Sequence, residues 1–336
     1  MHKSIDVGVL ATACMFVSAS AFASGASGAS GASGAPSAGT LETVATFAAG
    51  DVPESIAIDH AGNAYLSIGN TIRKRTPGGA QSTFATLPIA AFALGVKVGP
   101  DGCVYNVSTS LDPAVVGAFV WRTCTPGTAQ HYATLDPTGG PNDLAFDDAG
   151  NLFVTDPFLG RVYALTPNGT ATIWLQDAIL DGNPAAPFLG FHAVGVDGIA
   201  FDRDGENVYL GNLDYGKIIR VPIRHNGTAG TPTVFLADPR LVGIDGFAFD
   251  RQGTMFAAIN GQDHLIEISA RGRITPLAAG APLDGPSSIA FGTRHGDERT
   301  MYITSSAFTR TYGYQAGTPH PALLETNAEC PGLPLP

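Results

Sequence analysis

The chain has 336 residues, of which only 14% are charged, whereas Gly (42) and Pro (24) are abundant. This length allows one large all-β domain or two ordinary ones, and the composition favours many short strands joined by tight turns over long helices. The net charge of −11 argues against nucleic acid or an anionic membrane as a partner, because both select basic surfaces, and it suits a cation or a neutral small-molecule substrate.

The first residues are typical of a secretory signal peptide, which we place at residues 1–23. An apolar run over residues 7–17 leads to an AFA cleavage site at residues 21–23. The run is too short to span a bilayer, which disfavours a membrane anchor. We therefore expect a mature chain that begins at Ser24 and is secreted or periplasmic. Residues 24–40 are rich in Gly, Ser and Ala and are expected to form a flexible linker.

Six segments share one pattern: an anchor residue, two or three small or apolar residues, a turn and a second strand. Their anchors are 40, 48, 55, 48 and 42 residues apart, the length of one four-stranded propeller blade. We therefore predict an all-β fold: a six-bladed β-propeller of four-stranded antiparallel blades over residues 41–316, followed by a Pro-rich tail over residues 317–336. The anchors are Glu54, Leu94, Asn142, Asp197, Asp245 and Ser287.

The two ends of the repeat predict how the ring closes. A strand-like ETVATFA segment from Glu42 precedes the first anchor. The last repeat has strands at Ser287, Met301 and about Thr311, but no clear fourth strand follows them. The N-terminal strand should therefore complete the last blade, which protects sheet edges that would otherwise invite aggregation.

Two cysteines lie in strand-like runs that could pair as a hairpin, namely Cys103 in CVYNVS and Cys124 in AFVWRTC. A cross-strand disulfide is one interpretation, and it suits an oxidising compartment. Two buried thiols are the other, because free cysteine behaves as a small hydrophobic residue. The sequence leaves both open.

We expect the anchor residues to form the functional site. In a propeller the first strand of each blade lines the central channel, so the anchors should form a ring near one mouth. Three carboxylates would repel one another there unless a cation lay among them. The alternative is that each anchor only bonds backbone N–H groups. Oxygen ligands favour Ca²⁺, with Mg²⁺, Mn²⁺ or Zn²⁺ as other choices. We therefore predict one divalent metal ion held by Glu54, Asn142, Asp197 and Asp245.

Other acidic and aromatic residues receive different interpretations. Carboxylates such as Asp59 and Asp147 belong to the turn after each first strand, at the opposite mouth, and are interpreted as ordinary turn residues. The longest loop, residues 176–195, enters the fourth anchor, where Phe188, Phe191 and His192 could line an apolar pocket. We therefore name His192 as a candidate substrate-binding residue; a solvated surface histidine is the alternative.

Three anchor motifs, PESIAID, PNDLAFD and IDGFAFD, resemble the SMP-30/gluconolactonase/LRE-like family. The resemblance implies a divalent metal bound by Glu54, Asp197 and Asp245. It also implies that Asn142 contacts the substrate and that Asp245 acts as the general base. Two departures stand out, because the family usually has Asn at the position of Asp197 and Arg at that of Gly140. The missing arginine argues against sugar lactones as substrates.

The resemblance implies a divalent-metal-dependent hydrolase of a lactone or a related ester. The blade motifs also resemble NHL repeats and virginiamycin B lyase, which keeps two alternatives open. One is a non-catalytic binding propeller with a structural metal. The other is a metal-dependent lyase in which His192 or His264 removes a proton. The sequence indicates neither the oligomeric state nor the identity of the substrate.

Overall fold

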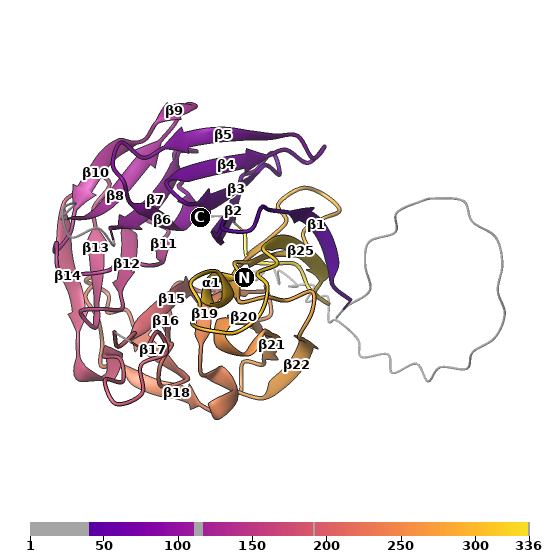
Figure 1. Ribbon diagram of the computed structural model, residues 1–336. Helices are drawn as coiled ribbons and strands as arrows, with labels where there is room; N and C mark the ends of the chain where they lie inside the picture. The colour runs from indigo at the N-terminus through magenta and orange to yellow at the C-terminus, as the bar shows by residue number, and fades with distance from the viewer. Residues whose placement is uncertain (1–39, 111–116, 191, 335–336) are drawn as a thin grey trace, which may run out of the picture. The chain divides into compact units, whose positions relative to one another are not determined.

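Six small sheets surround a central channel in the computed structural model, which describes residues 40–110, 117–190 and 192–334 (Figure 1). The predicted six-bladed β-propeller is confirmed. The predicted signal peptide, residues 1–23, and all but the last residue of the predicted linker, residues 24–40, lie outside the described residues. Among the residues described, no helix is long and apolar enough to cross a membrane.

Each blade is an antiparallel sheet whose first strand faces the channel. The first blade contains β2 (Pro53–Ile58), β3 (Ala64–Ile68), β4 (Thr71–Arg75) and β5 (Gln81–Thr86). The second contains β6 (Phe92–Val98), β7 (Val104–Thr109), β8 (Ala118–Thr123) and β10 (Gln130–Thr134). The third contains β11 (Leu144–Phe146), β12 (Leu152–Asp156), β13 (Arg161–Leu165) and β14 (Ala171–Gln176).

The other three blades follow the same order. The fourth contains β15 (Val196–Phe201), β16 (Asn207–Asn212), β17 (Lys217–Pro222) and β18 (Thr233–Ala237). The fifth contains β19 (Ile244–Phe249), β20 (Met255–Ile259), β21 (His264–Ile268) and β22 (Ile274–Ala279). The sixth combines β23 (Pro286–Phe291), β24 (Thr300–Ser305) and β25 (Ala322–Asn327) with β1 (Glu42–Thr46).

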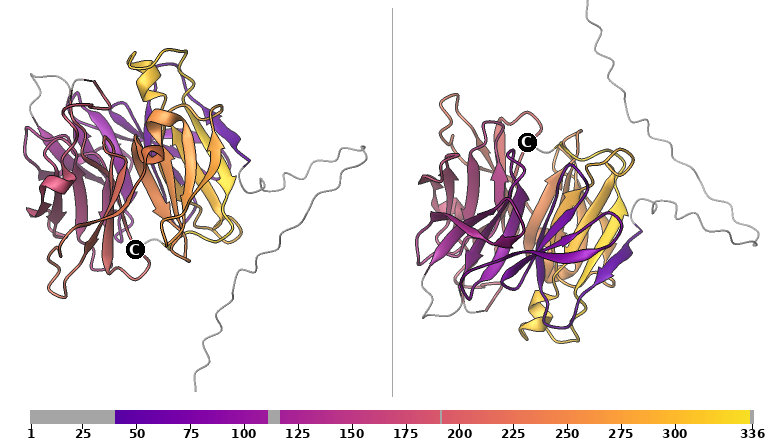
Figure 2. Two further views of the ribbon diagram at one scale, coloured as in Figure 1. Left: turned by 90° about the horizontal axis from the view of Figure 1, so that it is seen from below. Right: turned by 90° about the horizontal axis from the view of Figure 1, so that it is seen from above.

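Short helices occur only in connections of the described chain. These are the 3₁₀ helices η1 (Ala178–Leu180), η2 (Pro239–Leu241) and η3 (Asn260–Gln262), and the one-turn helix α1 (Phe308–Thr311). Figure 2 shows α1 projecting from one face of the propeller. The first blade also gains a short fifth strand, β9 (Gly127–Thr128), which pairs in parallel with β5 and so ties the second blade to the first.

The hydrophobic core lies between neighbouring blades. Val107 and Val120 of the second blade, for example, pack with Leu144 and Val154 of the third in one buried cluster. The first strand of every blade contacts the first strand of the next, all the way around the ring. Six such interfaces bury the apolar face of each sheet, which explains how strands of three to seven residues hold together.

Close packing of the first strands depends on glycines that follow some of the anchors. Gly198 follows Asp197, and a Cβ atom there would lie 2.2 Å from the Asp245 carbonyl oxygen. Gly246 follows Asp245, and its Cβ would lie 2.6 Å from the Ser287 carbonyl oxygen. Neighbouring anchors can therefore approach each other only because these positions lack a side chain.

The N-terminal strand closes the ring, as predicted. Strand β1 pairs antiparallel with β25, with Glu42 opposite Glu325 and Thr46 opposite Ala322. The third strand of this blade was placed wrongly, however. Residues near Thr311 form helix α1, and the strand is β25, inside the segment predicted as a tail over residues 317–336. The propeller therefore extends beyond residue 316.

The rest of the expected tail is also packed against the propeller. Gly332 forms a bridge with Asp250, and the Leu333 N–H donates to the Phe249 carbonyl oxygen at 3.0 Å. Leu333 and Pro334 then line a cavity at the far mouth of the channel, the mouth opposite the anchors. The C-terminal segment thus covers part of the far mouth.

A disulfide joins Cys103 to Cys124, which decides between the two interpretations of this pair. The cysteines flank β7 and β8, whose register places Val104 opposite Thr123. The bond closes a loop with a sequence separation of 21 residues, and a loop of that length stabilises a fold by about 3 kcal/mol in the chain-entropy account.

Candidate metal centre

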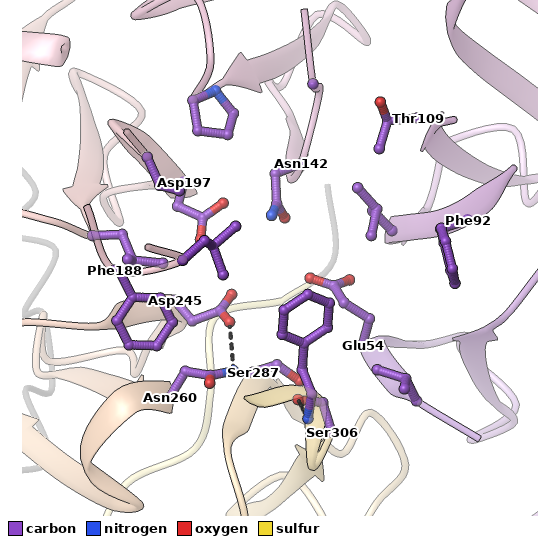
Figure 3. A pocket seen from close by; sticks show the side chains of 18 of the residues that line it. Glu54, Phe92, Thr109, Asn142, Phe188, Asp197, Asp245, Asn260, Ser287 and Ser306 are labelled. Atoms are coloured by element: carbon purple, nitrogen blue, oxygen red, sulfur yellow. Dashed lines mark hydrogen bonds between the residues drawn. The ribbon is translucent and has the colours of Figure 1, made fainter. Parts of the chain in front are cut away.

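Four of the six anchors point into one cavity on the anchor side of the channel (Figure 3). Glu54 lies in β2, Asp197 in β15 and Asp245 in β19. Asn142 lies two residues before β11, the first strand of the third blade. The remaining anchors, Leu94 and Ser287, line the same cavity. The structure therefore brings together every residue predicted to hold the metal, although their metal binding itself stays a prediction.

Hydrogen bonds within a blade and between neighbouring blades hold the anchor backbones in place. The Thr155 hydroxyl donates to the Asp197 carbonyl oxygen at 2.5 Å, and the Thr304 hydroxyl donates to the Glu54 carbonyl oxygen at 3.1 Å. The Asn142 N–H donates to the Thr155 carbonyl oxygen at 3.0 Å. These bonds use backbone oxygens and leave the anchor side chains directed at the channel.

Burial and neighbouring negative charges raise the pKa of all three anchor carboxylates. Asp197 is 2% exposed and Asp245 is 8% exposed. Burial is the largest cause that raises the pKa of Glu54, Asp197 and Asp245 well above ordinary values. Repulsion is the next cause: Asp197 and Glu54 raise the pKa of Asp245, and Asp197 raises that of Glu54. Without a cation the ring therefore favours protonated carboxyl groups.

Unpartnered oxygens show that the ring fits a cation. Glu54 Oε2 and Asp197 Oδ1 are buried and accept no hydrogen bond from the described residues. The Asn260 side-chain oxygen, which belongs to the same cavity, is also without a partner. A buried oxygen without a donor costs free energy, and a hard divalent cation satisfies several such oxygens at once.

The ring is wider than a closed cage. In the part of the chain described, only Asp101, Cys103 and Cys124 bring three acidic or sulfur ligand atoms within 4.8 Å of one another, and the two sulfurs are bonded to each other. The anchor carboxylates face a broader shared space. Ca²⁺ takes six to eight oxygens, so such a space leaves room for solvent or substrate oxygens beside the protein ligands.

Three further residues act on the anchor carboxylates and were missed; of these, only Asn260 lines the cavity. Asn260 Nδ2 donates to Asp245 Oδ2 at 3.1 Å, which lowers the pKa of Asp245 against the larger effects of burial and repulsion. Asp143 follows Asn142 and raises the pKa of both Glu54 and Asp197 by repulsion. Lys97 Nζ lies 3.5 Å from Asp143 Oδ1 and lowers the pKa of Glu54.

A repeat feature could have revealed Asn260. Both Asn212 and Asn260 stand 15 residues after an anchor aspartate, at the end of the second strand or directly after it. Asn212 is structural, because its amide donates to the Asp181 carbonyl oxygen at 2.9 Å. Asn260 instead supports Asp245. Asp143 and Lys97 had no comparable signal, because the other repeats carry Gly or Ser in place of Asp143.

The family model for the SMP-30/gluconolactonase/LRE-like region matches residues 114–307, more than half of the chain. This chain belongs to that family. The shared region includes three of the four predicted metal ligands, Asn142, Asp197 and Asp245. No curated protein sequence matches the chain.

Solved structures of similar fold include enzymes of several kinds. A gluconolactonase from Xanthomonas campestris is 17% identical, with 88% of this chain and 89% of that chain covered and a TM-score of 0.63. Regucalcin, a calcium-binding protein from Agrobacterium tumefaciens, is 19% identical over 86% and 96% of the two chains, with a TM-score of 0.61. Virginiamycin B lyase from Staphylococcus aureus is 14% identical over 85% and 98%, with a TM-score of 0.57. At these identities the likeness shows the fold alone.

Within this SMP-30/gluconolactonase-family propeller, the loop over residues 176–195 forms one wall of the cavity. Phe188 lines the cavity, as expected, and Phe191 lies outside the described residues. The buried Asp214 carboxylate anchors the loop by accepting three backbone N–H bonds. They come from Asn183 at 2.9 Å, from Phe188 at 2.7 Å and from Val194 at 2.7 Å.

His192 is not among the residues that line the cavity. Its exposed ring stacks on Phe158, with centroids 4.1 Å apart and planes at 24°, and its Nδ1 lies 2.8 Å from the Ala193 carbonyl oxygen. The ring therefore supports Phe158, which does line the cavity. Substrate binding by His192 itself stays a prediction.

The turn aspartates have the structural role that was predicted. Asp59 Oδ1 accepts the backbone N–H groups of Ala61 at 2.9 Å and Asn63 at 2.8 Å. Asp147 Oδ1 binds the N–H groups of Ala149 and Asn151 in the same way. These carboxylates are satisfied locally, which is the usual use of Asp in a turn.

Proposed function

We propose that this propeller is a divalent-metal-dependent hydrolase of a lactone or a related ester. One observation supports it above all: buried carboxylates with unpartnered oxygens converge on the floor of an open cavity. Such a floor suits a cation and a base placed beside a substrate carbonyl. Membership of the SMP-30/gluconolactonase family favours ester chemistry over other uses of the scaffold.

In this proposal Glu54, Asp197 and Asp245 hold the ion, and Asn142 contributes its amide oxygen. Oxygen ligands and a wide ring favour Ca²⁺, while Mg²⁺, Mn²⁺ and Zn²⁺ remain alternatives. A bound divalent ion supplies a Lewis acid that stabilises negative charge developing on the carbonyl oxygen.

Asp245 is the proposed general base. It takes a proton from the attacking water as the water oxygen bonds to the carbonyl carbon, and it returns that proton to the leaving ring oxygen as the ester bond breaks. The product is a hydroxy acid. Asn260 fixes Asp245 by its hydrogen bond to Oδ2, so the other carboxylate oxygen is available for the proton. Asn142 donates its amide N–H to the substrate and sets its orientation.

We also propose that the protein works outside the cytoplasm, in the periplasm or after secretion. The disulfide between Cys103 and Cys124 supports this, because such bonds persist in oxidising compartments. The predicted signal peptide over residues 1–23 is the second support.

The hydrolase proposal predicts that chelation abolishes lactone opening. Protein stripped with EDTA should lose at least about 100-fold of its turnover of δ-valerolactone, because carbonyl polarisation and base positioning both depend on the ion. Added Ca²⁺, Mg²⁺, Mn²⁺ or Zn²⁺ should restore the rate in a pH-indicator assay. Turnover that survives complete chelation would refute the proposed mechanism.

The same assay separates the alternatives. Metal binding without turnover of any lactone would favour a non-catalytic propeller with a structural ion. The lyase alternative has less support, because neither His192 nor His264 is among the residues that line the cavity.

A further inference from the structure

The cavity above the anchor ring has two aromatic walls. Phe158 and Phe188 form the wall beside the loop over residues 176–195. Phe92, Phe308, Tyr312 and Tyr314 form the opposite wall. The rings of Phe92 and Tyr312 meet edge to face with centroids 6.2 Å apart, and those of Phe308 and Tyr312 lie 4.9 Å apart. Figure 3 shows Phe92 and Phe188 on opposite sides of the ring of carboxylates.

The polar groups of the cavity are concentrated at its floor. The lining contains no lysine, arginine or histidine among the described residues. A substrate phosphate or carboxylate would therefore find no cationic side chain on the walls, and a polyhydroxylated ring would find few donors or acceptors there. Polar groups moved from water against such walls lose hydrogen bonds that nothing replaces.

Phe158 occupies the space that a side chain at position 140 would need. A Cβ atom on Gly140 would lie 2.5 Å from Phe158 Cδ2. The ring is fixed on its other side by the stacked His192, at 4.1 Å between centroids. The wall next to the anchor carboxylates is therefore an aromatic ring, and it leaves no space for a longer polar side chain at position 140.

The opposite wall remains partly open to solvent. Tyr312 is 39% exposed and Tyr314 is 46% exposed, and both border the cavity. The enclosed part of the cavity has a volume of about 150 Å³, and it opens to solvent beside these two tyrosines, so a substituent on a lactone ring can extend toward the opening. Exposed aromatic side chains at the mouth of a pocket are typical of a binding site for an apolar group.

We propose that the substrate is a neutral lactone or ester that carries an alkyl or aryl substituent, and that this substituent lies between the two aromatic walls. This inference rests on the proposed hydrolase function and adds the substrate class. The carbonyl group meets the carboxylate floor. The substituent extends between Phe158 and Tyr312 toward the opening, and hydroxylated sugar lactones are poor substrates.

Three lactones with the same six-membered ring test the proposal in the metal-loaded protein. They are δ-valerolactone without a substituent, δ-decalactone with a five-carbon chain, and glucono-δ-lactone with hydroxyl groups. The kcat/KM for δ-decalactone should exceed that for δ-valerolactone by about 100-fold, the effect of burying about two-thirds of the chain. Glucono-δ-lactone should be the poorest of the three. Equal or better turnover of glucono-δ-lactone would overturn the inference.

Alanine variants of the aromatic walls test whether these walls cause the preference for the substituted lactone. Phe158→Ala and Tyr312→Ala should each lower kcat/KM for δ-decalactone by about 10-fold while changing that for δ-valerolactone less than about 2-fold. Tyr215→Ala is the matched control, because Tyr215 is 42% exposed and does not line the cavity. Equal losses for both lactones in the wall variants would contradict the proposal.

The test also separates this inference from the proposed function. If no lactone is opened, the hydrolase proposal fails. Calorimetry with the lactams that correspond to δ-valerolactone and δ-decalactone then decides the ligand class. Binding of the pentyl-substituted lactam at least about 10-fold tighter than the plain lactam, lost in Phe158→Ala, would support an apolar site. Equal binding of both lactams would overturn it.

Discussion

Asp245→Asn should lower lactone turnover by about 1000-fold or more at saturating metal, the scale of losing a general base together with a charged ligand. Asparagine has nearly the same shape but accepts no proton near neutral pH. The Asn260 amide can still donate to the side-chain oxygen at position 245, as it does to Asp245 Oδ2 at 3.1 Å, so the local packing should survive. Steady-state kinetics and a thermal melt would measure activity and folding on the same sample.

Asp204→Asn is the control for this prediction. It removes the same charge from a turn at the opposite mouth, where the Asp204 side chain is 70% exposed. Its turnover should match that of the wild type. Asp245→Asn with turnover within about 10-fold of wild type would show that the proton goes elsewhere.

Asp197→Asn should make the metal-free protein more stable at pH 8 and the calcium-loaded protein less stable. Burial, followed by repulsion from Asp143 and Asp214, raises the pKa of Asp197 well above its unfolded value. A carboxyl group with a raised native pKa contributes its stability fully below the unfolded pKa and loses it as pH rises through the native pKa. Near pH 8 the ionised group therefore destabilises the metal-free fold, by about 3 kcal/mol for an uncompensated buried charge.

Chemical denaturation at pH 5 and pH 8, with and without Ca²⁺, measures this reversal. Without metal, the advantage of Asp197→Asn should be large at pH 8 and shrink toward pH 5. Excess Ca²⁺ should reverse the order, because the wild type has the stronger ligand set. Groups with a lowered pKa, such as Asp59, add the same pH-dependent stability to both proteins, so their contribution cancels when the variant is compared with the wild type. A metal-free wild type as stable as the variant at pH 8 would mean that the ring tolerates its charges unaided.

The blade repeat was sufficient to predict the ring and the convergence of its anchors. Turn glycines and the regular spacing fix where each first strand begins, and a propeller places those starts together. The closing strand from Glu42 was predictable for the same reason, since the last repeat lacked a partner at its edge.

Two parts of the fold and site depended on contacts that the repeat does not encode. Strand β25 follows the segment 306–321, which contains helix α1, and the glycines and prolines of that segment made the following strand resemble a tail in the sequence. His192 lies in the long loop as expected, but its orientation is decided by stacking on Phe158, which lies in the connection between β12 and β13. Lys97 and Asp143 form their pair across the second and third blades.

Calcium titration of the metal-free protein tests the central claim most directly, because it asks whether Glu54, Asp197 and Asp245 act on a single ion. We predict one bound ion per chain by calorimetry, with affinity lowered at least about 10-fold in each of Glu54→Gln, Asp197→Asn and Asp245→Asn. Wild-type protein that binds no divalent ion, or variants that all bind it as the wild type does, would contradict a metal centre at the anchor ring.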